Sequence, residues 1–231
     1  MSIKNIYEIM PKGLLKTPDN PNFHLHGIKL PARICVSANS GSGKSNWVVN
    51  FISICSQGKG TFSSIDIVTK DADEPLYNYL KMKSPQIQIK EGLHNLSPLS
   101  KFDKDEQHLV IVDDLVLSKD QSAISDYFCR CRKCGVTVIY LSQSYFKIPI
   151  FIRQNSNYVV ILGSMNKRNA NMLLNEFSVG TSKEQLANMY KEAVSQKLNC
   201  FVIDVDEQDP NKKFRKNFDL YLSPSDFGSD K

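Results

Sequence analysis

Short, almost continuously apolar runs alternate along the chain with segments whose apolar residues recur every three or four positions. The runs predict strands at residues 33–38, 64–70, 87–90, 108–115, 136–143, 158–162 and 200–205. The run HLVIVDDL at 108–115 is apolar on both alternating faces, which is typical of a parallel strand buried inside a sheet. The sequence therefore predicts a largely parallel central sheet.

Helical spacing between these runs supplies the connections that a parallel sheet needs. It predicts helices at 44–55, 74–83, roughly 118–131, 166–177 and 182–197. Ser118 and Gln121 form a capping-box pattern at the start of the third helix. Strands that alternate with helices in this way predict an α/β fold with helices on both faces of the sheet.

Composition shifts divide the chain into three parts. Residues 1–31 are rich in Pro and Asn and predict an irregular N-terminal arm, with His24 and His26 on its surface. Residues 32–206 contain the alternating strands and helices of one domain, and residues 207–231 read as a polar C-terminal tail. The basic run KKFRK at 212–216 predicts either a solvated segment or one that touches DNA phosphates.

Composition limits the class of protein. The chain has 231 residues, of which 41% are hydrophobic, enough for one substantial core. We expect neither a secretory signal peptide nor a transmembrane segment, and the six cysteines read as reduced thiols of a cytosolic protein. The net charge of +5 is compatible with nucleic acid as a partner without requiring it.

The segment VSANSGSGKSNW at 36–47 has the features of a phosphate-binding loop. It follows a strand, carries two glycines and opens a helix, so that backbone N–H groups and the helix N-terminus can face an anion. It matches the pattern G-x-x-x-x-G-K-[S/T], except that Ala38 replaces the first glycine. Lys44 would reach the β- and γ-phosphates of ATP, and the Ser45 hydroxyl would join the Mg²⁺ shell. The predicted nucleotide-binding residues are Ala38, Asn39, Ser40, Gly41, Ser42, Gly43, Lys44, Ser45 and Asn46.

Polar side chains end two later strands. Asp113 would hold Mg²⁺ through water, and Asp114 would polarise the attacking water as a general base. Gln143, at the tip of VTVIYLSQ, could orient that water beside the γ-phosphate. Alone, two adjacent acids more often mark a polar turn. Their position after a phosphate loop is what favours a catalytic interpretation here.

Taken together, ANSGSGKS, LVIVDD and RKCGVTVIYLSQ resemble the FtsK–HerA superfamily of ring ATPases over residues 30–205. The resemblance is strongest to the branch that packages genomes in poxviruses, giant viruses and virophages. It implies a three-layer P-loop domain of the ASCE, RecA-like type, with ATP and Mg²⁺ as cofactors. Asp114 stands where many relatives carry Glu, and its shorter side chain is compatible with slow turnover.

The resemblance also implies an arginine that reaches the nucleotide of a neighbouring subunit. Arg132, with Gly135 and Gln143, matches the family pattern of Arg, two residues, Gly and a Gln-tipped strand. Arg153 in IPIFIRQN ranks second and Arg130 third. The alternative for each is an exposed cation without a catalytic role.

The run CRCRKC at 129–134 invites a metal-site interpretation that helical geometry disfavours. Cys131 and Cys134 would share a helix face, whereas Cys129 would point elsewhere, so three sulfurs could not converge on one zinc ion.

The leading hypothesis is an ATP-driven double-stranded DNA translocase that assembles as a ring and loads a viral genome into a capsid. Its implied partners are DNA, contacted through phosphates without sequence preference, further copies of the chain, and a capsid or portal-vertex protein. We expect it in the host-cell cytoplasm or viral factory, or associated with virions. Two alternatives stay open, a nucleoside or nucleotide kinase and a non-catalytic nucleotide-binding scaffold.

Overall fold

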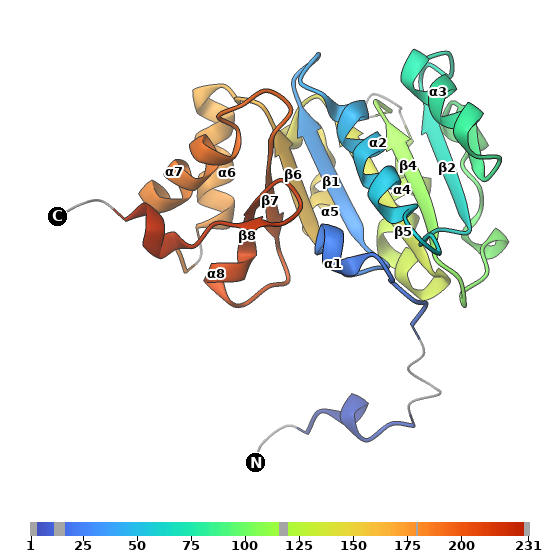
Figure 1. Cartoon of the computed structure of the whole chain (residues 1–231), viewed down its shortest axis with the longest axis horizontal. Helices are drawn as coiled ribbons and strands as arrows, with labels where there is room; N and C mark the ends of the chain where they lie inside the picture. Colours follow the sequence, from blue (N-terminus) through green and yellow to red (C-terminus); the bar gives the residue numbers. More distant parts are fainter. Residues whose placement is uncertain (1–3, 12–16, 116–119, 179, 229–231) are drawn as a thin grey trace.

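A computed structural model describes residues 4–11, 17–115, 120–178 and 180–228. Within them, nine strands form one sheet in the order β3-β2-β4-β5-β1-β6-β7-β8-β9 (Figure 1). The strands are β1 (Arg33–Ala38), β2 (Ser64–Thr69), β3 (Ile87–Glu91), β4 (His108–Asp113), β5 (Val136–Ser142), β6 (Tyr158–Leu162), β7 (Cys200–Asp204), β8 (Phe214–Lys216) and β9 (Leu220–Tyr221).

The strands from β3 to β6 in this order are all parallel, and the antiparallel strands β7, β8 and β9 extend one edge. Asp113 of β4 is level with Leu141 of β5, and Ser142 of β5 is level with Ser37 of β1. Because the strands are parallel and in this register, the segments that follow β1, β4 and β5 leave the sheet at the same edge.

Helices cover both faces of the sheet and give three layers (Figure 1). They are α1 (Phe23–His26), α2 (Lys44–Cys55), α3 (Pro75–Lys83), α4 (Ser122–Arg130), α5 (Ile150–Gln154), α6 (Lys167–Phe177), α7 (Lys183–Ala193) and α8 (Pro210–Lys213). The buried residues of α2 and α3 belong to one hydrophobic cluster, and those of α4 to α7 belong to a second. In β1, Ile34 and Val36 join the first cluster and Cys35 the second, because successive strand side chains point to opposite faces.

The structure confirms the α/β fold and the seven strands expected from the apolar runs. Except in the edge strand β3, where Gln88 and Glu91 are exposed, their side chains are buried on both faces, and the continuous apolar pattern reflects this directly. The third helix differs, because α4 begins at Ser122. The Gln121 side chain makes no N-terminal cap: its amide donates to the Leu115 carbonyl at 2.9 Å and accepts from the Tyr140 hydroxyl at 3.1 Å. Ser118 lies outside the described residues.

The expected polar tail turns out to extend the sheet. Strand β8 pairs with β7, and β9 pairs with β8. Within the KKFRK run, Arg215 is only 1% exposed, and it donates to the carbonyls of His26 and Phe218 at 3.2 and 3.0 Å. The expectation of a solvated or DNA-contacting run is therefore wrong for Arg215. Its neighbours come from distant segments that the local pattern does not reveal.

Part of the expected N-terminal arm also packs against the domain. The Asn22 amide donates to the carbonyl of Cys55 at 2.9 Å, which ties this segment to the end of α2. His26 is fully buried, packs edge-on against Phe51 and accepts from the Ile28 N–H at 3.0 Å, so its expected surface position is wrong. Burial lowers the pKa of His26 to about 4, with a further contribution from the charge of Arg215.

No helix in the described ranges combines the length and the apolar character needed to span a bilayer.

Candidate functional site

The loop between β1 and α2 has the backbone of an anion-binding site. Gly41 and Gly43 have φ angles of 73° and 96°, a region that side-chain-bearing residues rarely adopt. The Ser42 N–H donates to the Asn39 carbonyl at 3.0 Å and closes the turn. Gly43 then forms the N-cap of α2 without any capping side chain. The first N–H groups of α2 have no partner within the helix, and they suit a phosphate.

Lys44, the first residue of α2, approaches the acidic end of β4. Its Nζ atom lies 4.0 Å from Oδ1 of Asp114, and the lysine side chain is only 13% exposed. The Gln143 amide, at the end of β5, donates to Oδ2 of Asp114 at 2.7 Å. Three residues that the sequence analysis assigned to the site, from three separate elements, therefore meet at one carboxylate.

Asp114 adopts an unusual backbone conformation. Its φ angle is 54°, in the left-handed region, and its N–H donates to the Leu141 carbonyl at 3.3 Å. Non-glycine residues in this region are strained, and such strain is concentrated at functional sites. The turn directs Asp114 away from β4 toward Gln143 and Lys44, whereas Asp113 stays in the strand.

Asp113 is buried, 5% exposed, and accepts a hydrogen bond from the Tyr77 hydroxyl at 2.7 Å on Oδ2. Its other oxygen, Oδ1, is buried and has no hydrogen-bond partner among the residues that the structure describes. Burial raises the pKa of Asp113, while the bond from Tyr77 and the charge of Lys44 act in the opposite direction. A buried carboxylate oxygen without a partner is costly, and a cation or its water shell would satisfy it.

Ser45 completes this group of oxygen atoms. Its side chain neighbours the Tyr77 hydroxyl, which donates to Asp113. Hydroxyl and carboxylate oxygens are the ligands that Mg²⁺ prefers, directly or through water. Asp113 and Ser45 thus fit a magnesium ion by their chemistry and by the unsatisfied Oδ1 atom.

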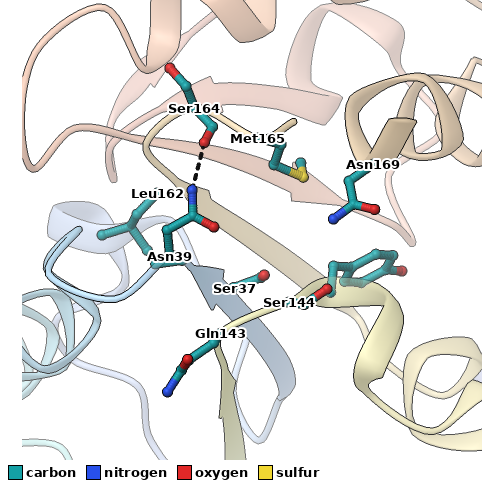
Figure 2. Close-up of a pocket in the computed structure, with 10 residues that line it drawn as sticks. Ser37, Asn39, Gln143, Ser144, Leu162, Ser164, Met165 and Asn169 are labelled. Carbon is teal, nitrogen blue, oxygen red and sulfur yellow. Dashed lines mark hydrogen bonds between the residues drawn. The ribbon is translucent and has the colours of Figure 1, made fainter. Parts of the chain in front are cut away.

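A small pocket, lined by both polar and apolar residues, adjoins the loop at the ends of β1, β5 and β6 (Figure 2). The Asn39 amide donates to the Ser164 carbonyl at 2.9 Å and links the loop to the segment after β6. Asn169 of α6 faces the pocket, and Gln143 points away from Asn169. Sequence reasoning missed Tyr77, Ser164 and Asn169 because each lies in an ordinary helix or loop pattern without a chemical motif.

The remaining loop residues lie around the turn. Ala38 is buried at the end of β1, where a side chain larger than glycine is accommodated, and Ser40 is exposed. The Asn46 carbonyl accepts from the Asn50 amide at 2.8 Å within α2.

Arg132 and Arg153 are not brought to the site. Arg132 is exposed in a 3-10 turn (Cys131–Cys134) before β5, whereas Gln143 follows the end of β5. Seven strand residues, at about 3.3 Å each, separate the two ends by roughly 20 Å. Arg153 is 14% exposed, pairs with Glu176 at 3.1 Å and stacks over the rings of Tyr145 and Phe146. Arg153 therefore has an intramolecular structural role.

Comparisons with known proteins identify a family and a shared fold. A family model described as "Poxvirus A32 protein" matches residues 24–208. Among curated protein sequences, none matches the chain significantly.

Solved structures share the fold at low sequence identity. The genome-packaging NTPase B204 of Sulfolobus turreted icosahedral virus 2, in complex with AMPPCP, has a TM-score of 0.58 and 14% identity over 81% of this chain and 97% of that chain. B204 of Sulfolobus turreted icosahedral virus, described as a DNA-packaging ATPase, has a TM-score of 0.57 and 13% identity over 86% of this chain and 98% of that chain. The cytoplasmic domain of the Thermomonospora curvata type VII secretion ATPase EccC has a TM-score of 0.54 and 13% identity over 87% of this chain and 26% of that chain.

Proposed function

The chain belongs to the poxvirus A32 protein family, and from this premise we propose that it is an ATPase that packages viral double-stranded DNA. The observation that carries the ATPase assignment is the meeting of Lys44, Asp114 and Gln143 beside a phosphate loop. The B204 proteins that share the fold are described as genome-packaging NTPases, which supports the same activity for this chain.

ATP would bind with its phosphates over residues 38–46. Lys44, at the N-terminus of α2, would contact the β- and γ-phosphate oxygens. Asp114 is partly exposed and is oriented by Gln143, so it can accept a proton from a water molecule that attacks the γ-phosphate. Gln143 would hold this carboxylate, and with it the water, in line with the bond that breaks.

Ser45 and Asp113 would hold Mg²⁺, the first through its hydroxyl and the second through water. Bound magnesium would neutralise the charge that develops on the phosphate oxygens. The buried Oδ1 atom of Asp113 is the acceptor that a metal-bound water would use.

Assembly into a ring would complete the site with an arginine from a neighbouring subunit. Arg132 is our first candidate because it is exposed and lies at the opposite end of β5 from its own phosphate loop. A residue so placed could reach a nucleotide only in another copy. Arg153 ranks below it, because it would have to leave Glu176 to reach a nucleotide.

DNA and a capsid or portal-vertex protein are the proposed partners, in the host-cell cytoplasm or the viral factory. The net charge of +5 favours contacts to DNA phosphates, which carry no sequence information. We therefore expect DNA affinity to fall steeply as salt increases and to depend little on DNA sequence.

The direct test is steady-state ATP hydrolysis, with and without double-stranded DNA, by wild type, Lys44→Ala and Asp114→Asn. We expect Lys44→Ala to lose nucleotide affinity and Asp114→Asn to keep affinity but lose at least 100-fold in kcat, since general-base catalysis contributes about that factor. Lys59→Ala, which changes an exposed lysine in the turn beyond the C-terminal end of α2, is the matched control.

Hydrolysis unchanged by both substitutions would refute the proposal. Phosphoryl transfer to a nucleoside acceptor in place of water would favour a kinase. Tight ATP binding without turnover by assembled rings on DNA would favour a scaffold.

A further inference from the structure

Tyr77 is a buried hydroxyl-bearing residue that none of the roles above includes. It lies on α3, is fully buried, and its ring packs in the hydrophobic cluster beneath α2. Its hydroxyl donates to Oδ2 of Asp113 at 2.7 Å and also neighbours Ser45. A buried tyrosine hydroxyl needs a polar partner, and here that partner is the carboxylate proposed to hold magnesium.

We propose that Tyr77 is a positioning residue that fixes the Asp113 carboxylate for Mg²⁺. This inference rests on the proposed function. A carboxylate at the end of a strand can rotate about its side-chain bonds, and a short hydrogen bond on one oxygen restricts that rotation. With Oδ2 occupied by Tyr77, Oδ1 is the oxygen left to accept from a metal-bound water.

The hydroxyl of Tyr77 can be removed without disturbing the hydrophobic packing of its ring. The ring belongs to the hydrophobic cluster, whereas the hydroxyl makes the hydrogen bond to Asp113. Phenylalanine keeps the ring and removes only the oxygen, so Tyr77→Phe tests the hydrogen bond without opening a cavity. Hydrogen bonds to charged groups are about twice as strong as neutral ones, so the effect is large enough to measure.

Tyr79 supplies a matched control on the same helix. It is 50% exposed, and its ring lies under the Lys83 ammonium, away from Asp113. Tyr79→Phe makes the same chemical change at a position that does not contact the site.

The experiment measures the dissociation constant of a fluorescent ATP analogue in EDTA and across a MgCl₂ titration. For Tyr77→Phe we expect the affinity for the ATP analogue in EDTA to stay within about twofold of wild type. The Mg²⁺ concentration that gives half of the Mg²⁺-dependent gain in this affinity should rise about tenfold. Tyr79→Phe should match wild type in both. In an Asp113→Asn background, Tyr77→Phe should change the Mg²⁺ requirement no further, because the partner carboxylate is gone.

A Mg²⁺ requirement of Tyr77→Phe equal to that of wild type would overturn the inference. An equal loss of affinity with and without Mg²⁺ would also overturn it, since that pattern indicates a structural role alone. Wild-type binding that is indifferent to Mg²⁺ would refute the metal assignment of the proposed function, and this inference with it.

Discussion

The hydrogen bond between Gln143 and Asp114 allows a quantitative prediction about catalysis. The amide donates at 2.7 Å to a carboxylate whose backbone is already held at a φ angle of 54°. Gln143→Ala removes this donor and leaves the phosphate loop intact. A hydrogen bond to a charged group contributes about 1.5–3 kcal/mol, and we take the lower end because Gln143 is exposed and Asp114 is only half-buried. At about 1.4 kcal/mol per factor of ten, kcat should fall about tenfold.

The assay is steady-state hydrolysis combined with nucleotide binding. Because the Gln143 amide donates its hydrogen bond to Asp114, the substitution should act on hydrolysis, and the dissociation constant of ATP should stay within about twofold of wild type. Gln57→Ala, at an exposed glutamine just beyond α2, serves as the control. Turnover of Gln143→Ala at the wild-type rate would refute the reasoning, since it would mean that the orientation of Asp114 does not limit hydrolysis.

Two further predictions concern assembly and pH. Lys44→Ala and Arg132→Ala should each be inactive, and an equal mixture should regain activity because about one quarter of its interfaces pair an intact lysine with an intact arginine; a mixture as inactive as its components would exclude Arg132 as the trans-acting group. The pKa of His26, about 4 in the fold against 6.5 ordinarily, means that the unfolded chain binds more protons between these values. Its contribution to stability is therefore complete above pH 6.5 and is lost as pH falls toward 4. Thermal melts should show that the melting temperature falls less between pH 6.5 and 4 for His26→Gln than for wild type. His24→Gln, at an exposed histidine, is the control, and an equal fall for His26→Gln and wild type would contradict the prediction.

Local patterns in the sequence were enough to predict the parts of the site that lie at strand ends. Runs such as HLVIVD are continuously apolar because both faces of β4 are buried, and the polar residues that follow mark where the strand leaves the core. The glycines and Lys44 identify the phosphate loop because backbone conformation and helix start are encoded within a few residues. The family match over residues 24–208 agrees with the resemblance that these motifs carry.

Only the tertiary structure decided which distant residues share an environment. The strand order puts β5 between β1 and β4, and this places Gln143 against Asp114. Tyr77 meets Asp113 from another helix, and nothing in its own segment indicates that partner.

The misjudged segments have the same physical cause. His26 and Arg215 come from polar stretches that read as surface, yet each is buried because segments far apart in sequence pack together. Hydrophobic periodicity indicates which face of its own helix or strand a residue lies on. Burial by a second segment depends on pairings across the chain, and those are set by the folded arrangement as a whole.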